Sequence, residues 1–244
     1  LDFSRDFPID RLIFLYCQSQ SMNPPLAIDI DGTMSREDRS IEGRIFDALR
    51  SWNGTIVVAT GKAVPYPIAL CDYIGIDILV VAENGGIIVH NDDLIPTYDL
   101  SALHKFDKAF RGDGHDYGWP GSDLVNRWRQ TEIAASHSVS LDLLKRYASQ
   151  FDLNVVDSNY AYHISPSGVD KGAGLRAISK RIGLDPMDFV SIGDSENDIP
   201  LFLATGNSYA VSNAPLSVQK MANNVTTLPS ASGLLEVLSS LTND

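Results

Sequence analysis

The chain has 244 residues, of which 31 are acidic and 19 basic, giving a formal net charge of -12, and 44% of its residues are hydrophobic. This size and composition predict a soluble globular protein with one core, or with a core and a modest inserted domain. The acidic balance without a long basic run argues against nucleic acid as a partner. No apolar run approaches the roughly 20 residues that cross a bilayer, so we expect neither membrane association nor export.

The two cysteines, Cys17 and Cys71, are too few for a disulfide framework, and their spacing does not match a zinc site. We therefore expect a reducing, cytoplasmic location. Residues 1–22 show no repeating pattern, and Met22 directly precedes the first expected strand. Two interpretations stay open for residues 1–22, namely an extension outside the fold and an extra strand or helix packed on the domain.

From residue 25 onward, short apolar runs alternate with helical patterns, which indicates a parallel sheet covered by helices. The first block predicts three strands, at 26–28, 55–59 and 78–81, and two helices, near 41–52 and 64–74. After Asp170 the pattern predicts strands at 189–192 and 209–211 and helices near 171–182, 198–204, 215–222 and 231–241. We expect 23–87 and 166–244 to form one α/β core, a Rossmann-like parallel sheet.

Between the two blocks, over residues 88–165, the regular alternation of strands and helices is lost. Here the sequence predicts hairpin-like strands, a helix near 103–110, an irregular glycine-rich loop at 111–121, and then a further helix and strands. This segment is therefore expected to be a smaller α/β domain inserted into the core.

Polar side chains follow several of the core strands. Asp29 and Asp31 follow the first strand, Thr60 follows the second, and Asp194 and Asp198 follow the strand at 189–192. Because the carboxyl ends of parallel strands share one edge of a sheet, we expect four carboxylates to converge there. Two unit charges 4 Å apart repel by about 4 kcal/mol at an effective dielectric near 20, so such a cluster needs a cation. Oxygen ligands without His or Cys favour Mg²⁺.

Four ordered motifs resemble those of the haloacid dehalogenase superfamily. They are Asp29-Ile30-Asp31-Gly32-Thr33, then Thr60-Gly61, then Lys171, then Gly193-Asp194-Ser195-Glu196-Asn197-Asp198. The resemblance extends from about residue 25 to 215 and implies a phosphoryl-transfer enzyme. An acidic turn alone would explain one such motif, but not four in this order at strand ends and helix starts.

The resemblance implies a catalytic role for each motif. Asp29 is expected to be the nucleophile that forms an aspartyl-phosphate, and Asp31 the acid and base that serves the leaving group and then water. Thr60 and Gly61 are expected to bind the phosphoryl oxygens, and Lys171 to neutralise their charge. Taken singly, Thr60-Gly61 would be a helix cap or a turn, and Lys171 a surface lysine.

The metal site implied by the resemblance contains Asp29, Asp31, Asp194 and Asp198. Of Asp194 and Asp198, one is expected to bind Mg²⁺ directly and the other through water, and the sequence leaves open which is which. Ser195 and Asn197 are expected to orient the ligands, with helix capping as the alternative.

The inserted domain resembles the larger α/β kind of cap in this superfamily, which covers the active site and chooses the substrate. The segments Glu83-Asn84-Gly85-Gly86 and Asn126-Arg127-Trp128-Arg129 resemble archaeal-type phosphoglycolate phosphatases. Asn84 is expected to bind substrate, and Arg127 or Arg129 to grip a substrate carboxylate. The alternative is that both arginines only stabilise the cap or its surface. Tyr162 and His163 are further cleft candidates, and a packed histidine is an equal interpretation for His163.

The sequence as a whole predicts a Mg²⁺-dependent phosphomonoesterase for a small phosphate ester, with 2-phosphoglycolate as the preferred substrate. A sugar phosphatase or phosphomutase on the same core is the alternative, and a phosphate-ester-binding protein without catalysis is a third reading. Gln130 departs from the family pattern, in which an acidic residue is common after that arginine, and this departure concerns the substrate rather than the chemistry. A homo-oligomer is compatible with the sequence.

Overall fold

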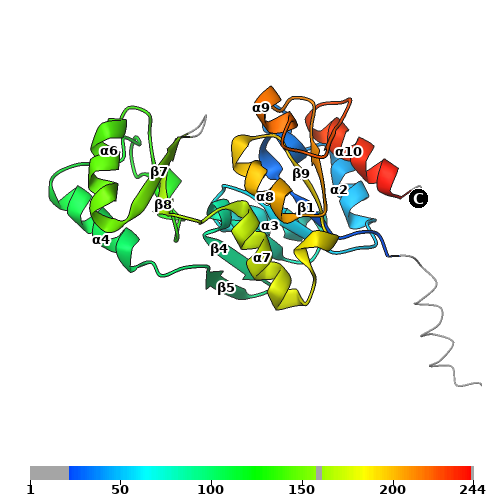
Figure 1. The fold of residues 1–244 in the computed structure, drawn as a ribbon, viewed down its shortest axis with the longest axis horizontal. Coiled ribbons are helices and arrows are strands. Elements are labelled where there is room, and N and C mark those ends of the chain that lie inside the picture. The colour runs from blue at the N-terminus through cyan, green and yellow to red at the C-terminus, as the bar shows by residue number, and fades with distance from the viewer. Residues whose placement is uncertain (1–21, 158–160, 243–244) are drawn as a thin grey trace, which may run out of the picture.

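The computed structural model describes residues 22–157 and 161–242. Except for Met22, the predictions for residues 1–22 lie outside the described residues. The chain forms a larger core and a smaller cap, which lie beside each other in Figure 1, with the cap in green. Among the described residues, no helix is both long enough and apolar enough to span a bilayer.

The core is built on an eight-stranded sheet with the order β11-β10-β9-β1-β2-β3-β4-β5. Six strands run parallel, and these are β1 (Leu26–Ile28), β2 (Ile56–Ala59), β3 (Leu79–Ala82), β9 (Val190–Gly193), β10 (Asn207–Ala210) and β11 (Asn224–Val225). Every residue of β1, β2, β3 and β9 is buried, as is typical of parallel strands covered on both faces. This arrangement confirms the predicted α/β class and Rossmann-like core.

Helices cover both faces of the core sheet. One apolar cluster packs the sheet against α2 (Gly43–Arg50), α3 (Pro65–Ile74) and α10 (Ser230–Leu241). A second cluster packs the opposite face against α7 (Lys171–Ile182) and α8 (Ile199–Ala204), and α9 (Leu216–Gln219) lies beside β10. Because β1 lies between β2 and β9, the two halves of the sequence meet at the centre of the sheet.

The boundary between core and insertion differs from the sequence prediction. Residue 88 was expected to begin the inserted domain, but it lies inside β4 (Ile87–His90), which pairs antiparallel with β3. β4 then pairs with β5 (Asp93–Pro96), so the hairpin extends the core sheet as far as Pro96. The alternating pattern of a hairpin does not show which sheet it joins, and here β4 pairs with β3, which ends at Ala82 just before the turn that leads into β4.

The cap is the part of the chain between β5 and α7. It contains a three-stranded antiparallel sheet with the order β6-β8-β7, formed by β6 (Ile133–Ala135), β8 (Tyr162–Pro166) and β7 (Leu153–Asp157). The helices are α4 (Ser101–Gly112), the short α5 (Leu124–Arg127) and α6 (Leu141–Ala148). Its apolar cluster is separate from those of the core and is centred on stacked Phe106, Phe110 and Tyr117. The cap is thus a small α/β unit with its own core.

Candidate active site

The site begins at the carboxyl end of β1. Asp29 directly follows β1 and is buried, and an irregular turn over Ile30–Met34 then reverses the chain. Gly32 in this turn has φ +80°, and a Cβ atom there would lie 2.2 Å from Oδ2 of Asp194. Glycine is therefore required on two grounds, the left-handed backbone and the close approach of the next strand's carboxylate.

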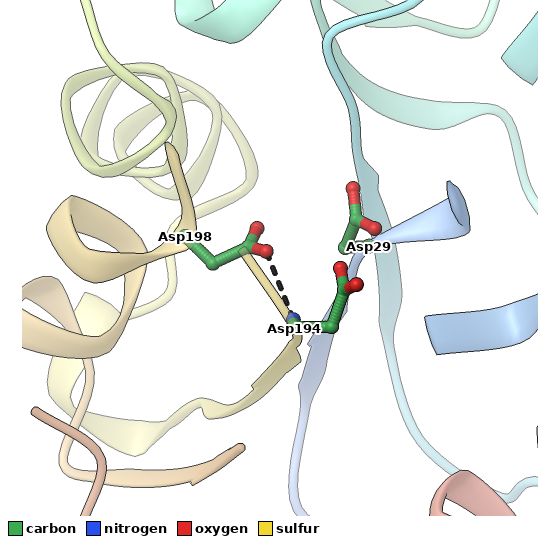
Figure 2. A group of neighbouring side chains, drawn as sticks. All are labelled: Asp29, Asp194 and Asp198. Carbon is green, nitrogen blue, oxygen red and sulfur yellow. Dashed lines mark hydrogen bonds between the residues drawn. The ribbon is translucent and has the colours of Figure 1, made fainter. Parts of the chain in front are cut away.

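The neighbouring strand β9 supplies two more carboxylates. Asp29, Asp194 and Asp198 each place one oxygen within 4.8 Å of the other two, and Figure 2 shows their side chains converging. Oδ2 of Asp198 accepts hydrogen bonds from the backbone N–H groups of Asp194 and Ser195, both at 3.0 Å. Asp198 thereby closes the loop after β9 and holds Asp194 against the end of β1.

Lys171 neutralises part of this charge. It is the first residue of α7, whose N-cap is Asp170, and the residue is 1% exposed. Its Nζ lies 2.7 Å from Oδ1 of Asp29 and 2.6 Å from Oδ1 of Asp198. Burial lowers the pKa of Lys171, but the two carboxylates more than offset this and raise its pKa above the ordinary value.

Three carboxylates around one ammonium group leave an excess of negative charge. Burial raises the pKa of Asp29 well above its ordinary value, and Asp198 and Asp194 add to this while Lys171 opposes it. Burial, with the nearby charge of Asp198, also raises the pKa of Asp194 to about 7. A cation bound between these groups would stabilise their charged forms.

The donor set fits Mg²⁺. Oδ1 of Asp194 is buried and has no hydrogen-bond partner among the described residues, so it is free to act as a ligand. By contrast, both oxygens of Asp198 already accept hydrogen bonds, one from Lys171 and the other from the loop backbone. Asp29 and Asp194 would therefore hold the ion directly, while Asp198 shapes the loop, and an all-oxygen set is what Mg²⁺ prefers.

Asp31 lies apart from the three carboxylates. Its side chain is 48% exposed, and Oδ2 forms an ion pair with Nζ of Lys62 at 2.9 Å. Among the described residues, the cluster within 4.8 Å does not include Asp31. The structure therefore brings together three of the four expected carboxylates, and the prediction that Asp31 is a metal ligand stays a prediction.

Thr60 and Gly61 lie beside this cluster, directly after β2. Thr60 is fully buried, and its Oγ1 accepts a hydrogen bond from the backbone N–H of Lys62 at 3.1 Å. The carbonyl oxygen of Gly61 accepts a hydrogen bond from Nη1 of Arg129 at 3.0 Å. The expected phosphoryl-binding loop thus touches the cap.

The structure distinguishes the two arginine candidates. The guanidinium of Arg127 stacks over the ring of Trp128, 5.5 Å from its centroid, and makes a surface contact of the cap. The side chain of Arg129 is 7% exposed and forms a buried ion pair with Glu132 as well as the bond to Gly61. Its Nε is buried without a partner among the described residues. Arg129, rather than Arg127, contacts the Gly61 loop, and its role in binding substrate stays a prediction.

The remaining predicted residues lie around this junction of cap and core. Nδ2 of Asn84 donates to Glu132 at 3.0 Å, and its Oδ1 accepts from Asn197 at 2.9 Å. Nδ1 of His163 lies 3.2 Å from Oε1 of Glu132. Ser195 donates to Oδ1 of Asn197 at 2.6 Å and also caps the turn at Asp198. Tyr162 packs with the apolar cluster of the cap.

Sequence reasoning missed three residues near the site. Asn213 donates to the carbonyl of Gly32 at 3.1 Å, and because it follows β10, the same strand-end rule would have found it. Lys62 follows Thr60-Gly61 and could have been found in the same way. Glu132 carries no such signal, because an acidic residue in a loop before a cap strand is buried only through tertiary contacts.

The chain is similar in sequence to known proteins over most of its length. Residues 26–123 and 123–238 match the profile of the haloacid dehalogenase-like hydrolases. A phosphoglycolate phosphatase of Halobacterium salinarum is 52% identical over 192 residues, covering 79% of this chain and 85% of the relative. One from Natronomonas pharaonis is 41% identical over 219 residues, covering 89% of this chain and 97% of the relative.

Solved structures share the fold. A Thermoplasma acidophilum protein superposes with a TM-score of 0.77 at 24% identity and covers 91% of this chain and 99% of its own. A haloacid dehalogenase-like hydrolase from Bacteroides thetaiotaomicron gives a TM-score of 0.68 at 18% identity, covering 90% of this chain and 99% of its own. At these identities the likeness supports the fold and nothing finer.

Proposed function

The chain belongs to the haloacid dehalogenase-like hydrolases, and from this premise we propose that it is a Mg²⁺-dependent phosphomonoesterase acting on a small phosphorylated acid. The observation that carries the proposal is the largely buried cluster of Asp29, Asp194 and Asp198 around Lys171, at the carboxyl edge of β1 and β9. Such an edge is where open α/β sheets bind ligands. The related proteins named phosphoglycolate phosphatase give the proposal its substrate class.

In the proposed reaction Asp29 attacks the phosphorus atom of the substrate. One carboxylate oxygen forms a bond to phosphorus as the bond to the leaving alkoxide breaks, which yields an aspartyl-phosphate and the free alcohol. The other oxygen keeps its bond to Lys171, so the carboxylate is held in one orientation. Water then attacks the same phosphorus atom, inorganic phosphate leaves, and the Asp29 carboxylate is restored.

Asp31 is proposed to move the proton in both steps. It donates a proton to the leaving oxygen in the first step and accepts one from the attacking water in the second. Its half-exposed position, outside the cluster of Asp29, Asp194 and Asp198, suits a group that exchanges protons with substrate and solvent. The ion pair with Lys62 fixes the direction in which the Asp31 side chain points.

Charge on the transferring group is met by the surrounding donors. Lys171, the hydroxyl of Thr60 and the N–H groups near Gly61 are proposed to face the phosphoryl oxygens, since phosphoryl transfer is catalysed mainly by positioning and electrostatics. Mg²⁺, held by Asp29 and Asp194, would supply further neutralisation of phosphoryl charge.

The proposed substrate is 2-phosphoglycolate, which carries a carboxylate next to its phosphate ester. Arg129 is the fitting partner, because its guanidinium is buried beside the Gly61 loop and its Nε lacks a partner among the described residues. An arginine can hold a carboxylate with two parallel hydrogen bonds. Arg129 donates directly to the carbonyl oxygen of Gly61, so its guanidinium lies close to the proposed phosphoryl-binding loop. This short separation suits a two-carbon acid better than a sugar.

Release of inorganic phosphate from a panel of esters tests the proposal. The panel contains 2-phosphoglycolate, several sugar phosphates and phenyl phosphate, each with Mg²⁺ and with EDTA. We expect the highest kcat/KM with 2-phosphoglycolate and no turnover with EDTA. A sugar phosphate that is clearly better would move the substrate class, and an isomerised sugar phosphate without free phosphate would indicate a mutase. Binding of esters without phosphate release in the wild type would end the proposal of catalysis.

A further inference from the structure

The turn Glu83–Gly85, which follows β3, is held in an unusual backbone conformation. All three residues have positive φ, at 50°, 54° and 96°. For Glu83 and Asn84 such backbone is costly unless its surroundings enforce it, and enforced strain of this kind concentrates at functional positions. Gly85 is required, because a Cβ atom there would lie 1.9 Å from the carbonyl oxygen of Asp170. The turn therefore abuts the residue before Lys171.

The cap holds this turn in place. The buried carboxylate of Glu83 accepts hydrogen bonds from the backbone N–H groups of Gln130 and Thr131 and from the Thr131 hydroxyl. On the core side, the N–H groups of Glu83 and Asn84 donate to the carbonyls of Lys62 and Thr60, both at 3.1 Å. The turn is thus bonded at once to the cap and to the expected phosphoryl-binding loop.

Asn84 extends this contact to the loop after β9. Its Nδ2 donates to Oε2 of Glu132 in the cap, and its Oδ1 accepts from Nδ2 of Asn197. Oδ1 of Asn197 accepts a hydrogen bond from the Ser195 hydroxyl, and the backbone N–H of Ser195 donates to Oδ2 of Asp198. A continuous series of hydrogen bonds therefore runs from the cap to the loop that carries two carboxylates of the site.

From this geometry we propose that Asn84 is a positioning residue, which ties the loop 194–198 to Glu132 so that the seating of the cap on the core sets the geometry of the carboxylate cluster. Both polar ends of the Asn84 side chain have protein partners, which suits a link between elements. The functional consequence is that the site is fully assembled when the cap is seated, as expected of caps that complete a catalytic constellation on closing. Glu132 is the cap's half of this link.

A reciprocal swap tests the link. Asn84→Asp keeps the acceptor for Asn197 but turns the donor toward Glu132 into a second carboxylate, so the two side chains repel. Glu132→Gln supplies an amide donor from the cap side, and the double variant Asn84→Asp/Glu132→Gln restores the bond with its direction reversed. We expect Asn84→Asp to lower kcat by about tenfold or more, and the double variant to recover most of that loss. A double variant no better than Asn84→Asp would overturn the proposal.

A second measurement is independent of catalysis. Asn84→Gly removes the side chain while suiting the positive φ, and should therefore fold. We expect faster hydrogen exchange in peptides covering Gly193–Asp198, where the N–H groups of Asp194 and Ser195 bond to Asp198. Asn91→Gly is the matched control, because Asn91 has φ 55° in the exposed turn between β4 and β5 and should leave both exchange and kcat unchanged.

The two measurements separate the possible failures. The kinetic swap rests on the proposed phosphatase function, and a wild-type protein that releases no phosphate would end that function and leave the exchange experiment to decide the link. Unchanged exchange at 193–198 in Asn84→Gly would overturn the link even in a fully active phosphatase. A loss confined to thermal stability, with kcat and exchange as in the wild type, would reduce Asn84 to a structural role and also overturn the proposal.

Discussion

Two largely buried polar clusters lie within one molecule and differ in their charge balance. The catalytic cluster (Asp29, Lys171, Asp194 and Asp198) sets three carboxylates against one ammonium group, and the pKa values of Asp29 and Asp194 are raised. The junction cluster (Asn84, Arg129, Glu132 and His163) surrounds one carboxylate with donors. Although burial raises the pKa of Glu132, Arg129 and His163 lower it to about 2.

Charge balance distinguishes a binding site from a structural joint. In a charge-balanced cluster the protein itself supplies the opposite charge, so the cluster can hold two domains together. A cluster with excess charge of one sign is stable only when something else supplies the opposite charge, so it marks the place where an ion or substrate binds. The two clusters should therefore respond in opposite ways to removal of a carboxylate and to addition of Mg²⁺.

The largest effect is expected from Asp29→Asn. The variant removes the proposed nucleophile and should lower kcat by at least about 10³-fold. It also removes one of three repelling carboxylates, so the metal-free variant should melt at a temperature no lower than the wild type. Phosphate release and thermal melting in EDTA measure the two effects. Asp72→Asn, an exposed carboxylate on α3, is the control and should change neither. Turnover by Asp29→Asn near the wild-type rate would remove Asp29 from the reaction.

In the junction cluster, removal of a carboxylate should destabilise the fold instead. Since the pKa of Glu132 is about 2 in the folded protein and 4.5 ordinarily, its charged form favours folding. That contribution is fully present above about pH 4.5 and is lost as the pH falls toward about 2. The difference between these two pKa values corresponds to about 3 kcal/mol of unfolding free energy.

Urea denaturation of the wild type and Glu132→Gln across this pH range measures the contribution. The difference in unfolding free energy should be constant near neutral pH and should shrink as the solution is acidified below about pH 4.5. The groups facing Glu132 are Arg129, His163 and Asn84, with Glu83 and Tyr98 close enough to interact electrostatically. A difference that does not depend on pH would mean that Glu132 acts by packing alone.

Addition of Mg²⁺ should stabilise the folded protein through the catalytic cluster and not through the junction cluster. A ligand at about 100 times its Kd stabilises the folded state by about 2.7 kcal/mol, which for a chain of this size raises the Tm by several degrees. We expect this shift in the wild type and in Glu132→Gln, because the junction cluster needs no ion. Asp194→Asn should lose most of the shift, since Oδ1 of Asp194 is buried and has no hydrogen-bond partner among the described residues. An equal shift in Asp194→Asn would move the ion elsewhere.

Most of the catalytic cluster could be placed from the sequence, because it obeys a local rule. Asp29 and Asp194 follow buried strands, Lys171 begins a helix, and parallel strands align their carboxyl ends whatever the rest of the chain does. The helix over 171–182 was predicted with the bounds that the structure gives. The rule could not predict the direction of the Asp31 side chain. Asp31 lies in the irregular turn after β1, and its side chain points toward Lys62.

Most contacts of the junction cluster could not be predicted from the sequence, because they join segments far apart in the chain. The Arg129–Glu132 ion pair spans only three residues, but the bonds of Glu132 to Asn84 and His163 follow from no local pattern. The domain boundary was missed for a different reason. The alternation over residues 87–96 predicts a hairpin but not the sheet that it joins, and β4 pairs with β3 across the short turn that begins at Glu83.

The smallest expected effect is on substrate preference. It tests whether Arg129 of the junction cluster also binds the leaving group of the substrate. Arg129→Gln should lower kcat/KM for 2-phosphoglycolate about tenfold more than for phenyl phosphate, which has no carboxylate to lose. The ratio between the two substrates matters more than either rate, because Arg129→Gln also leaves Glu132 without its ion pair and so perturbs both reactions together.

Arg127→Gln is the matched control for this ratio. Its guanidinium stacks on Trp128 at the surface of the cap, so we expect the ratio of kcat/KM values to stay as in the wild type. If Arg127→Gln changed the ratio and Arg129→Gln did not, the carboxylate would be read at the surface of the cap. Arg129 would then belong wholly to the joint between cap and core, and the charge-balanced cluster would have no part in substrate choice.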